Sequence, residues 1–110
     1  MTSDESACGA LVRRRLPEGF SRHVFEVAPG LALEVEPDRV PDAVVVVEHG
    51  ELELECPAGT CGRFGPGSMI PISRFPVARL RNIGPGPLVL VAVLRATDEF
   101  RPVAGSYGDS

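Results

Sequence analysis

The sequence predicts a small all-β domain with little helix. Apolar segments are short, and several alternate apolar with charged residues, which is the two-residue period of a strand. The 12 glycines and 11 prolines lie mostly between these segments, where turns need them. A helical turn is predicted only within residues 5–16, where Gly9 weakens it and Pro17 ends it. Seven or so short strands joined by turns predict a sandwich or a barrel, and 110 residues suit one domain.

Three strands are predicted in the first half of the chain. Residues 24–27 form a short apolar and aromatic segment that ends at a Pro-Gly turn. Residues 31–36 alternate apolar with acidic side chains, which indicates a half-buried strand. Residues 43–48 are β-branched and apolar on both faces, so this strand is expected at the centre of a sheet. Pro37 and Pro41 bracket the loop before it.

A tight hairpin is predicted where residues 43–48 meet residues 51–56. The second strand alternates strictly, and only two residues separate the two strands, the second of them Gly50. The alternation places three side chains in the core and three in water. The core set is Leu52, Leu54 and Cys56, and the water-facing set is Glu51, Glu53 and Glu55.

The second half of the chain predicts three further strands. Residues 57–67 are rich in Gly and Pro and are expected to form turns. Residues 68–72 form a short strand that Pro71 places at an edge or a bulge. Residues 77–82 alternate, and residues 88–94 are apolar throughout, which indicates burial on both faces or a subunit contact.

The domain organisation follows from these elements. We expect an N-terminal lead-in segment at residues 1–19, a barrel over residues 20–104 and a mobile tail at residues 105–110. The acidic start is unlike a signal peptide, and no segment reaches the roughly 18 apolar residues of a membrane span, so we expect a cytoplasmic protein with no membrane partner. A net charge of −4 argues against nucleic acid as a partner.

The three cysteines are an odd number, which disfavours a disulfide framework and suits a reducing compartment. Cys56 and Cys61 have four residues between them, a spacing that permits a turn disulfide or half of a zinc site. No second pair of Cys or His lies nearby, as structural zinc requires. We therefore interpret them as two ordinary thiols.

Three segments taken in order resemble the cupin family. They are residues 44–54, a strand with an acidic-Gly turn; residues 64–71, where glycines precede a strand and a proline; and residues 77–82, followed by Gly-Pro turns and an apolar strand. The resemblance covers about half of the chain. It implies a jelly-roll β-barrel, commonly a homodimer, with a ligand cavity inside.

The sequence departs from this family at its metal ligands. The family's glutamate, seven residues before the glycine, corresponds to Ala43, and the histidine four residues before the asparagine corresponds to Ala78. A transition metal needs three or four N or O donors, and the chain has only two histidines. We therefore expect a barrel without a metal or other cofactor. Depending on spacing, the family's two remaining histidines correspond to Pro37 and Arg39 or to Glu36 and Asp38.

Four residues are candidates for a functional site. Glu36 and Asp38 are predicted at the barrel mouth, where two carboxylates are able to share a proton in acid–base catalysis; the alternative is a solvated acidic face. Arg39 and His49 are candidate ligand-binding residues, although a turn histidine is more often simply exposed.

Arg79 and Arg81 alternate to the outside and are expected to pair with the glutamates of residues 51–55.

Three functions remain open at this point. The first is a metal-independent enzyme, such as an isomerase, epimerase or cyclase, that binds a small organic molecule and uses Glu36 and Asp38 as acid and base. The second is a non-catalytic barrel, either a ligand sensor or a dimeric interaction module. The third keeps a metal, held by Glu36, Asp38 and His49 in an altered arrangement.

Overall fold

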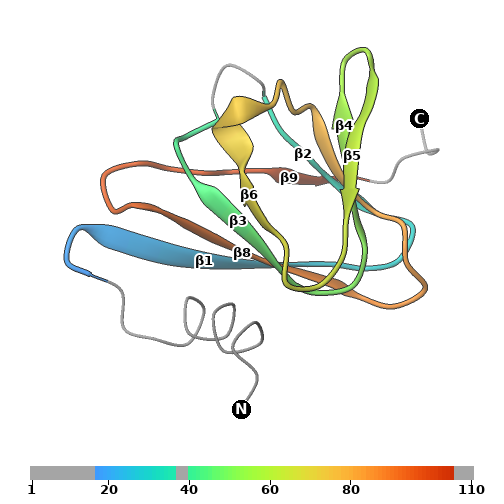
Figure 1. The fold of residues 1–110 in the computed structure, drawn as a ribbon, viewed down its shortest axis with the longest axis horizontal. Helices are drawn as coiled ribbons and strands as arrows, with labels where there is room; N and C mark the ends of the chain where they lie inside the picture. Colours follow the sequence, from blue (N-terminus) through green and yellow to red (C-terminus); the bar gives the residue numbers. More distant parts are fainter. Residues whose placement is uncertain (1–16, 37–39, 106–110) are drawn as a thin grey trace.

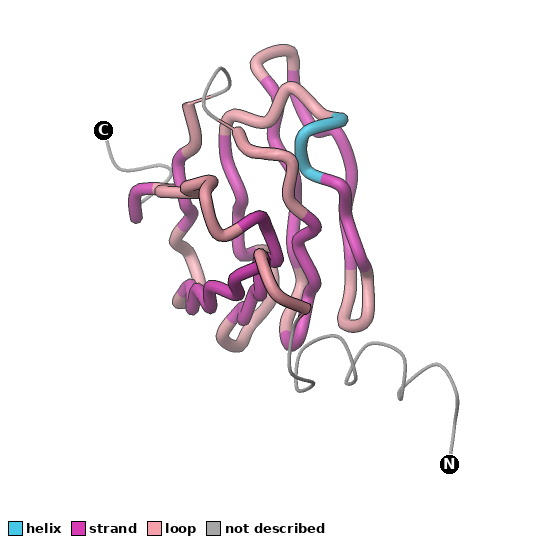
Figure 2. The backbone as a smooth tube through the Cα atoms, turned by 90° about the vertical axis from the view of Figure 1, so that its left-hand side faces the viewer, coloured by secondary structure: helices cyan, strands magenta, loops and turns pink. Residues whose placement is uncertain are grey.

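The structure, a computed structural model, describes residues 17–36 and 40–105. Within these ranges nearly all regular structure is strand, and the helical part is a single 3-10 turn, η2 (Ile72–Arg74) (Figures 1 and 2). The all-β prediction with little helix is therefore confirmed. The strands are β1 (Phe20–Val27), β2 (Ala32–Glu34), β3 (Val44–His49), β4 (Leu52–Cys56), β5 (Gly59–Phe64), β6 (Met69–Pro71), β7 (Arg79–Asn82), β8 (Leu88–Arg95) and β9 (Val103–Gly105).

The strands form two antiparallel sheets, a four-stranded sheet in the order β1-β8-β3-β6 and a five-stranded sheet in the order β5-β4-β7-β2-β9. The pairings are nested, because β1 pairs with β8, β2 with β7, β3 with β6 and β4 with β5. A long hairpin rolled up in this way is a jelly roll, with β9 added at the edge beside β2.

The core lies between the two sheets and is made by the inward side chains of both. Strands β3 and β8 are the inner strands of the four-stranded sheet, so the predicted central position of residues 43–48 is confirmed. The fully buried large side chains of the core cluster are Leu52, Leu54, Ile70, Ile72, Leu80, Leu88, Leu90, Leu94, Val45, Val47 and Val77.

The predicted hairpin between residues 43–48 and 51–56 is wrong. β3 belongs to the four-stranded sheet and β4 to the five-stranded sheet, so the chain crosses between sheets at this point. Gly50 has φ +90, and a Cβ built on it lies 2.6 Å from the Pro87 carbonyl oxygen. A glycine at this position therefore serves a close backbone crossing, which has the same sequence signature as a two-residue hairpin turn.

The hairpin that does form joins β4 to β5, in a region where the sequence predicted turns. Cys56 and Cys61 are joined by a disulfide across it, with a Cα–Cα distance of 5.9 Å, so their interpretation as two separate thiols is corrected. Register shifts between Leu54 and Glu55, which marks a bulge opposite the second cysteine.

The outer face of the five-stranded sheet carries an ion-pair network that confirms the predicted role of two arginines. Arg81 Nη1 lies 2.6 Å from a carboxylate oxygen of Glu55 and 3.1 Å from one of Glu53, and Arg79 Nη1 lies 3.4 Å from Glu55. The expected solvation of Glu53 is wrong, since this residue is only 4% exposed. Arg63 on β5 and Arg81 on β7 reach over it from both sides.

The ends of the chain are described only in part. β1 begins at Phe20 and β9 ends at Gly105, whereas residues 1–16 of the predicted lead-in segment and residues 106–110 of the predicted tail lie outside the described residues. Within the described chain, none of the helical structure has the length and apolar character needed to cross a membrane.

Candidate ligand pocket

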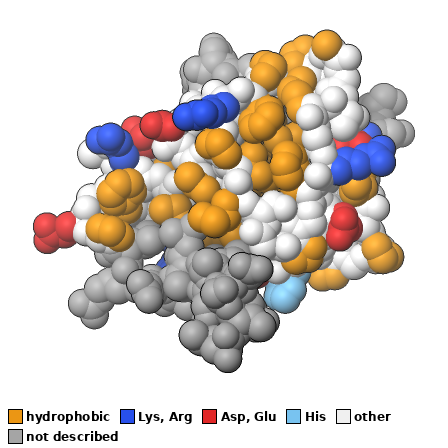
Figure 3. Space-filling model, viewed as in Figure 1, with side chains coloured by type: hydrophobic (Ala, Val, Ile, Leu, Met, Phe, Trp, Pro, Cys, Tyr) orange, Lys and Arg blue, Asp and Glu red, His pale blue; other side chains and the backbone are white. Residues whose placement is uncertain are grey.

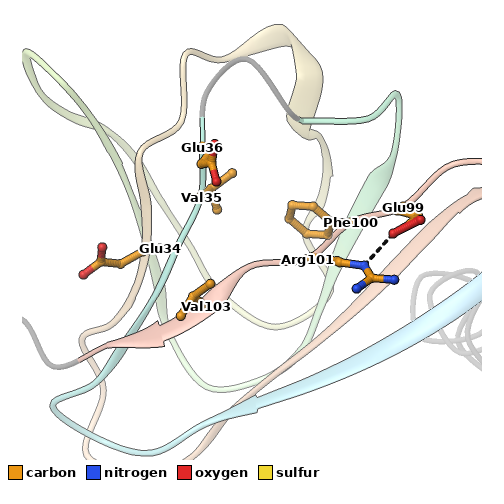
Figure 4. Close-up of a pocket in the computed structure, with 7 residues that line it drawn as sticks. All are labelled: Glu34, Val35, Glu36, Glu99, Phe100, Arg101 and Val103. Carbon is orange, nitrogen blue, oxygen red and sulfur yellow. Dashed lines mark ion pairs between the residues drawn. The ribbon is translucent and has the colours of Figure 1, made fainter.

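A cavity of about 570 Å³ opens at the edge of the five-stranded sheet, where β2 lies beside β9. This volume is within the range of small-molecule sites. One wall comes from the end of β2 and the two residues after it, and the other from the β8–β9 connection and the start of β9 (Figure 4). The lining residues are Glu34, Val35, Glu36, Glu99, Phe100, Arg101 and Val103.

Register fixes the two walls relative to each other. Glu34 pairs directly with Val103 in the antiparallel pair of β2 and β9. The two walls continue from this pair on the same side, one as residues 35–36 and the other as residues 99–102. The backbone N–H of Val35 donates to the carbonyl of Ala78, the residue just before β7, at 2.9 Å, which holds the first wall beside the start of that strand. The pocket is therefore built on paired strands at its base and on connections at its mouth.

Phe100 anchors the second wall. It is 5% exposed and belongs to the core cluster. Its ring makes an edge-to-face contact with Phe25 of β1, with ring centroids 5.7 Å apart and an interplanar angle of 81°. This contact ties the β8–β9 connection to the four-stranded sheet. Figure 4 shows the Phe100 ring between Val35 and the Glu99–Arg101 pair.

The pocket carries more negative than positive charge. Three of its side chains are carboxylates, and Arg101, which forms an ion pair with Glu99, is its single cation among the described lining residues. Both partners of that pair are largely exposed, so water screens their attraction. Glu34 lies 3.9 Å from Arg79 Nη2, and in Figure 4 its carboxylate is directed away from Phe100. Carboxylate oxygens accept hydrogen bonds, so this mouth suits a ligand that donates them.

The structure brings one of the four predicted site residues into the pocket. Glu36 lines it, directly after β2. Asp38 and Arg39 lie outside the described residues, so their predicted roles stay predictions. His49 is exposed at the end of β3, at the opposite end of the molecule from the end of β2 (Figure 1). The residue therefore lies far from this pocket.

The altered metal site is not assembled by the described residues. His49 is the last residue of β3 and lies about 16 Å from Val44 at the start of that strand, at roughly 3.3 Å per strand residue. No group of three His, Cys, Asp or Glu side chains able to hold a metal ion occurs within residues 17–36 and 40–105. The expectation of a barrel without a metal remains a prediction from the sequence.

Sequence reasoning missed the second wall of the pocket. Residues 99–103 follow the last sustained apolar segment, and their short run has no strand period of its own. A faint signal is present, because Phe100 is one of five phenylalanines in a chain without tryptophan and stands between two opposite charges. Such an isolated aromatic residue in a polar tail indicates that the segment returns to the core.

Comparison with known proteins adds little to this picture. No known family and no curated protein matches the chain. Among solved structures, the chain is similar to the regulatory domain of Toxoplasma gondii PKA in a co-crystal with cAMP, with 17% sequence identity and a TM-score of 0.43. The likeness covers 70% of this chain and 31% of that chain, so this protein spans about a third of its length. A likeness this remote assigns neither a family nor a ligand.

Proposed function

We propose that this protein is a non-catalytic jelly-roll module that binds a small organic molecule in the pocket between β2 and the β8–β9 connection. The observation that carries the proposal is the pocket itself, a cavity of about 570 Å³ with an anchored aromatic wall and carboxylates at its mouth. Small-molecule sites commonly combine an apolar wall with a few polar groups that orient the ligand.

The lining indicates the class of ligand. An apolar portion of the molecule would contact Val35, Phe100 and Val103, and its hydroxyl or ammonium groups would donate to Glu36 and its neighbours. A ligand with its own carboxylate would meet like charges there. We therefore propose a neutral or cationic molecule with an apolar body.

Binding accounts for the described pocket better than acid–base catalysis does. Two of its carboxylates, on Glu34 and Glu99, are exposed and lie beside arginines, whereas a catalytic acid and base need environments that separate their affinities for a proton. The enzyme hypothesis depends on Asp38 as the partner of Glu36. It remains a separate prediction, tested by turnover of the Glu36→Gln and Asp38→Asn variants.

The cupin resemblance is part of the same proposal. The jelly-roll strand order agrees with what that resemblance implies. The two alanines at ligand positions, Ala43 and Ala78, offer no metal donor, which is why the proposed ligand is held by side chains alone.

The test is a binding screen followed by NMR on the isotope-labelled full chain. The probes are small aromatic or aliphatic amines and amino alcohols, with carboxylic acids of the same carbon skeleton as matched controls. We expect saturable shifts at Glu36, Phe100 and Val103 for the amines, and none for the acids. Saturable shifts confined to other regions, or equal binding of amines and acids, would contradict the proposed site or its charge preference, respectively.

Two variants separate binding from folding. Val103→Ser removes the apolar contact of a side chain that is 67% exposed and adds no charge, so the fold is retained while this part of the apolar wall is lost. Loss of an apolar wall contact worth about 1.5 kcal/mol corresponds to roughly tenfold weaker binding. His49→Ala is the control and is expected to bind as the unmodified protein does.

A further inference from the structure

β1 is the longest and most regular of the four edge strands that the two sheets have among the described residues. β6 and β9 have three residues each, and β6 ends at Pro71. β5 contains two glycines and pairs with β4 through a bulge. β1 has eight residues, contains neither glycine nor proline, and pairs with β8 without a register shift. A long and regular edge strand is a template on which another strand can pair.

The backbone groups of β1 point alternately toward β8 and toward the outer edge, the edge away from β8. The backbone N–H of Ala96 donates to the carbonyl of Gly19 at 2.7 Å, and the register of β1 with β8 continues from there without a shift. Because the side of hydrogen bonding alternates along an antiparallel strand, the odd-numbered residues of β1 bond to β8. The N–H and C=O groups of Arg22, Val24 and Glu26 therefore point to the outer edge.

The side chains of these three residues are exposed as well. Val24 is 63% exposed, and Arg22 and Glu26 on either side of it are also exposed. The side of the molecule where β1 begins, at the left of Figures 1 and 3, displays apolar and charged side chains together. The order along the outer edge is positive, apolar and negative, which becomes complementary to itself when the strand is read in the opposite direction.

We propose that β1 pairs antiparallel with β1 of a second copy, about a two-fold axis through Val24. Val24 then lies opposite Val24 of the partner subunit, and Arg22 lies opposite Glu26 of the partner subunit on each side of the axis. These are hydrogen-bonded pairs, in which the two residues exchange both of their N–H···O bonds. Opposite charges that face each other across strands stabilise the pairing. The two four-stranded sheets become one continuous sheet of a size that is common in proteins.

The charges of β1 select this register and this partner. A two-fold axis at Arg22 or at Glu26 places like charges opposite each other, which is destabilising. An axis at His23 or at Phe25 places Val24 opposite a charged residue of the other copy. Among these five axes, the one at Val24 alone matches charge with charge and apolar with apolar side chain. A strand that complements itself in this way favours a second copy as its partner, in a closed two-fold contact. The contact is independent of the proposed pocket, which lies on the other sheet.

The first test is the association of the full chain, measured by sedimentation velocity over a range of protein concentrations. We expect a dimer that dissociates on dilution, and more readily in high salt, because salt screens exposed charges. Val24→Pro removes an N–H donor from the outer edge alone, where a strand tolerates proline, so it should give a monomer with an unchanged circular dichroism spectrum. A chain that stays monomeric at millimolar concentration, or a dimer that Val24→Pro leaves intact, would overturn the proposal.

Charge reversal tests the register without relying on the proline variant. Arg22→Glu and Glu26→Arg each place like charges opposite each other on both sides of the axis, and each should weaken association roughly tenfold or more. The double variant restores opposite charges and should associate nearly as the unmodified protein does. Arg74→Glu is the control, because it makes the same change of net charge at an exposed residue of η2 and should have no effect. A double variant that associates no better than the single variants would overturn the register.

Isotope-filtered NMR on a mixture of labelled and unlabelled chains locates the contact directly. Next to the central pair, His23 lies opposite Phe25 of the partner subunit in a non-hydrogen-bonded pair, where the Cα atoms come closest. We expect nuclear Overhauser contacts between the Hα atoms of these two residues in different copies. Contacts between copies that are confined to other strands would overturn the proposal. Contacts of the outer edge of β1 with residues of the same chain would overturn it too.

Discussion

Replacement of Gly50 by alanine tests how tightly the chain is held where it crosses between the sheets. A Cβ at this position would lie 2.6 Å from the Pro87 carbonyl oxygen and 2.8 Å from the Leu88 Cα, and both are backbone atoms. Gly30 is a matched control because its φ of +82 is close to the +90 of Gly50, yet a Cβ there meets nothing within 4 Å. The two variants therefore share the backbone strain and differ only in the clash.

The magnitudes follow from these two contributions. A left-handed backbone conformation disfavours alanine by about 1–2 kcal/mol. Reduced entropy of the unfolded chain offsets about 0.4–1 kcal/mol of this in both variants. Displacement of packed backbone around Gly50 adds about 1–3 kcal/mol, by analogy with overpacking. We expect Gly30→Ala to lose about 1 kcal/mol and Gly50→Ala about 2–4 kcal/mol of unfolding free energy.

Urea unfolding followed by circular dichroism measures both losses against the unmodified protein, with the slope on denaturant as a check that the unfolding transition is the same. A difference between the variants of less than about 0.5 kcal/mol would refute the close approach of residues 50 and 87–88. It would then follow that the crossing tolerates a side chain and that only its backbone conformation requires glycine.

Three further changes test other contacts. Asn82→Ala removes a buried side-chain amide that is hydrogen-bonded to three backbone groups at 2.8–2.9 Å, and should lower the free energy of unfolding in denaturant by about 2–4 kcal/mol. A decrease below about 1 kcal/mol would contradict a stabilising role for these hydrogen bonds. Arg81→Met should lower the free energy of unfolding by about 2–3 kcal/mol, because it removes a cation that compensates the buried carboxylate of Glu53. Arg63→Met should lower it by less than about 1 kcal/mol, because the Arg63 side chain is 71% exposed and its ion pair with Glu53 is screened by water. The reverse order would refute Arg81 as the main partner of Glu53. Joint replacement of Cys56 and Cys61 by serine should lower the free energy of unfolding by about 2 kcal/mol, because the disulfide closes only a short loop. Thiol titration of the unmodified protein, unfolded without reductant, should find one free thiol per chain, whereas three would contradict the disulfide.

The sequence predicted those strands in which the order of apolar and polar residues follows directly from which side chains are buried. Residues 31–36 and 51–56 alternate because one face of each packs in the core, and the segments around β3 and β8, which are apolar on both faces, lie at the centre of their sheet. β5 was missed because its two glycines interrupt any alternation, and it is held as a strand by pairing with β4 and by the disulfide. Such strands are specified by their partners rather than by their own residues.

The same distinction applies to the candidate site. Glu36 was found because it extends an alternating strand, and the structure places it in the pocket. The opposite wall, residues 99–103, is brought there by the pairing of β9 with β2, a contact between distant parts of the chain that no local pattern encodes. Burial of Glu53 was likewise invisible, because it depends on arginines from two other strands.

The nested pairing of the strands also sets an order in which the protein can fold. β4 and β5 are adjacent in the chain, whereas Phe20 at the start of β1 meets Arg95 at the end of β8. Closing the outermost pair requires almost the whole chain, and domains with such distant pairings fold slowly, on the order of milliseconds to seconds. During synthesis β1 leaves the ribosome long before its partner exists, with Phe25 and Val27, which pack in or against the core of the folded protein, still uncovered. We therefore expect the nascent chain to be most prone to aggregation until β8 has emerged, and the β4–β5 hairpin to be the first part to reach its final shape.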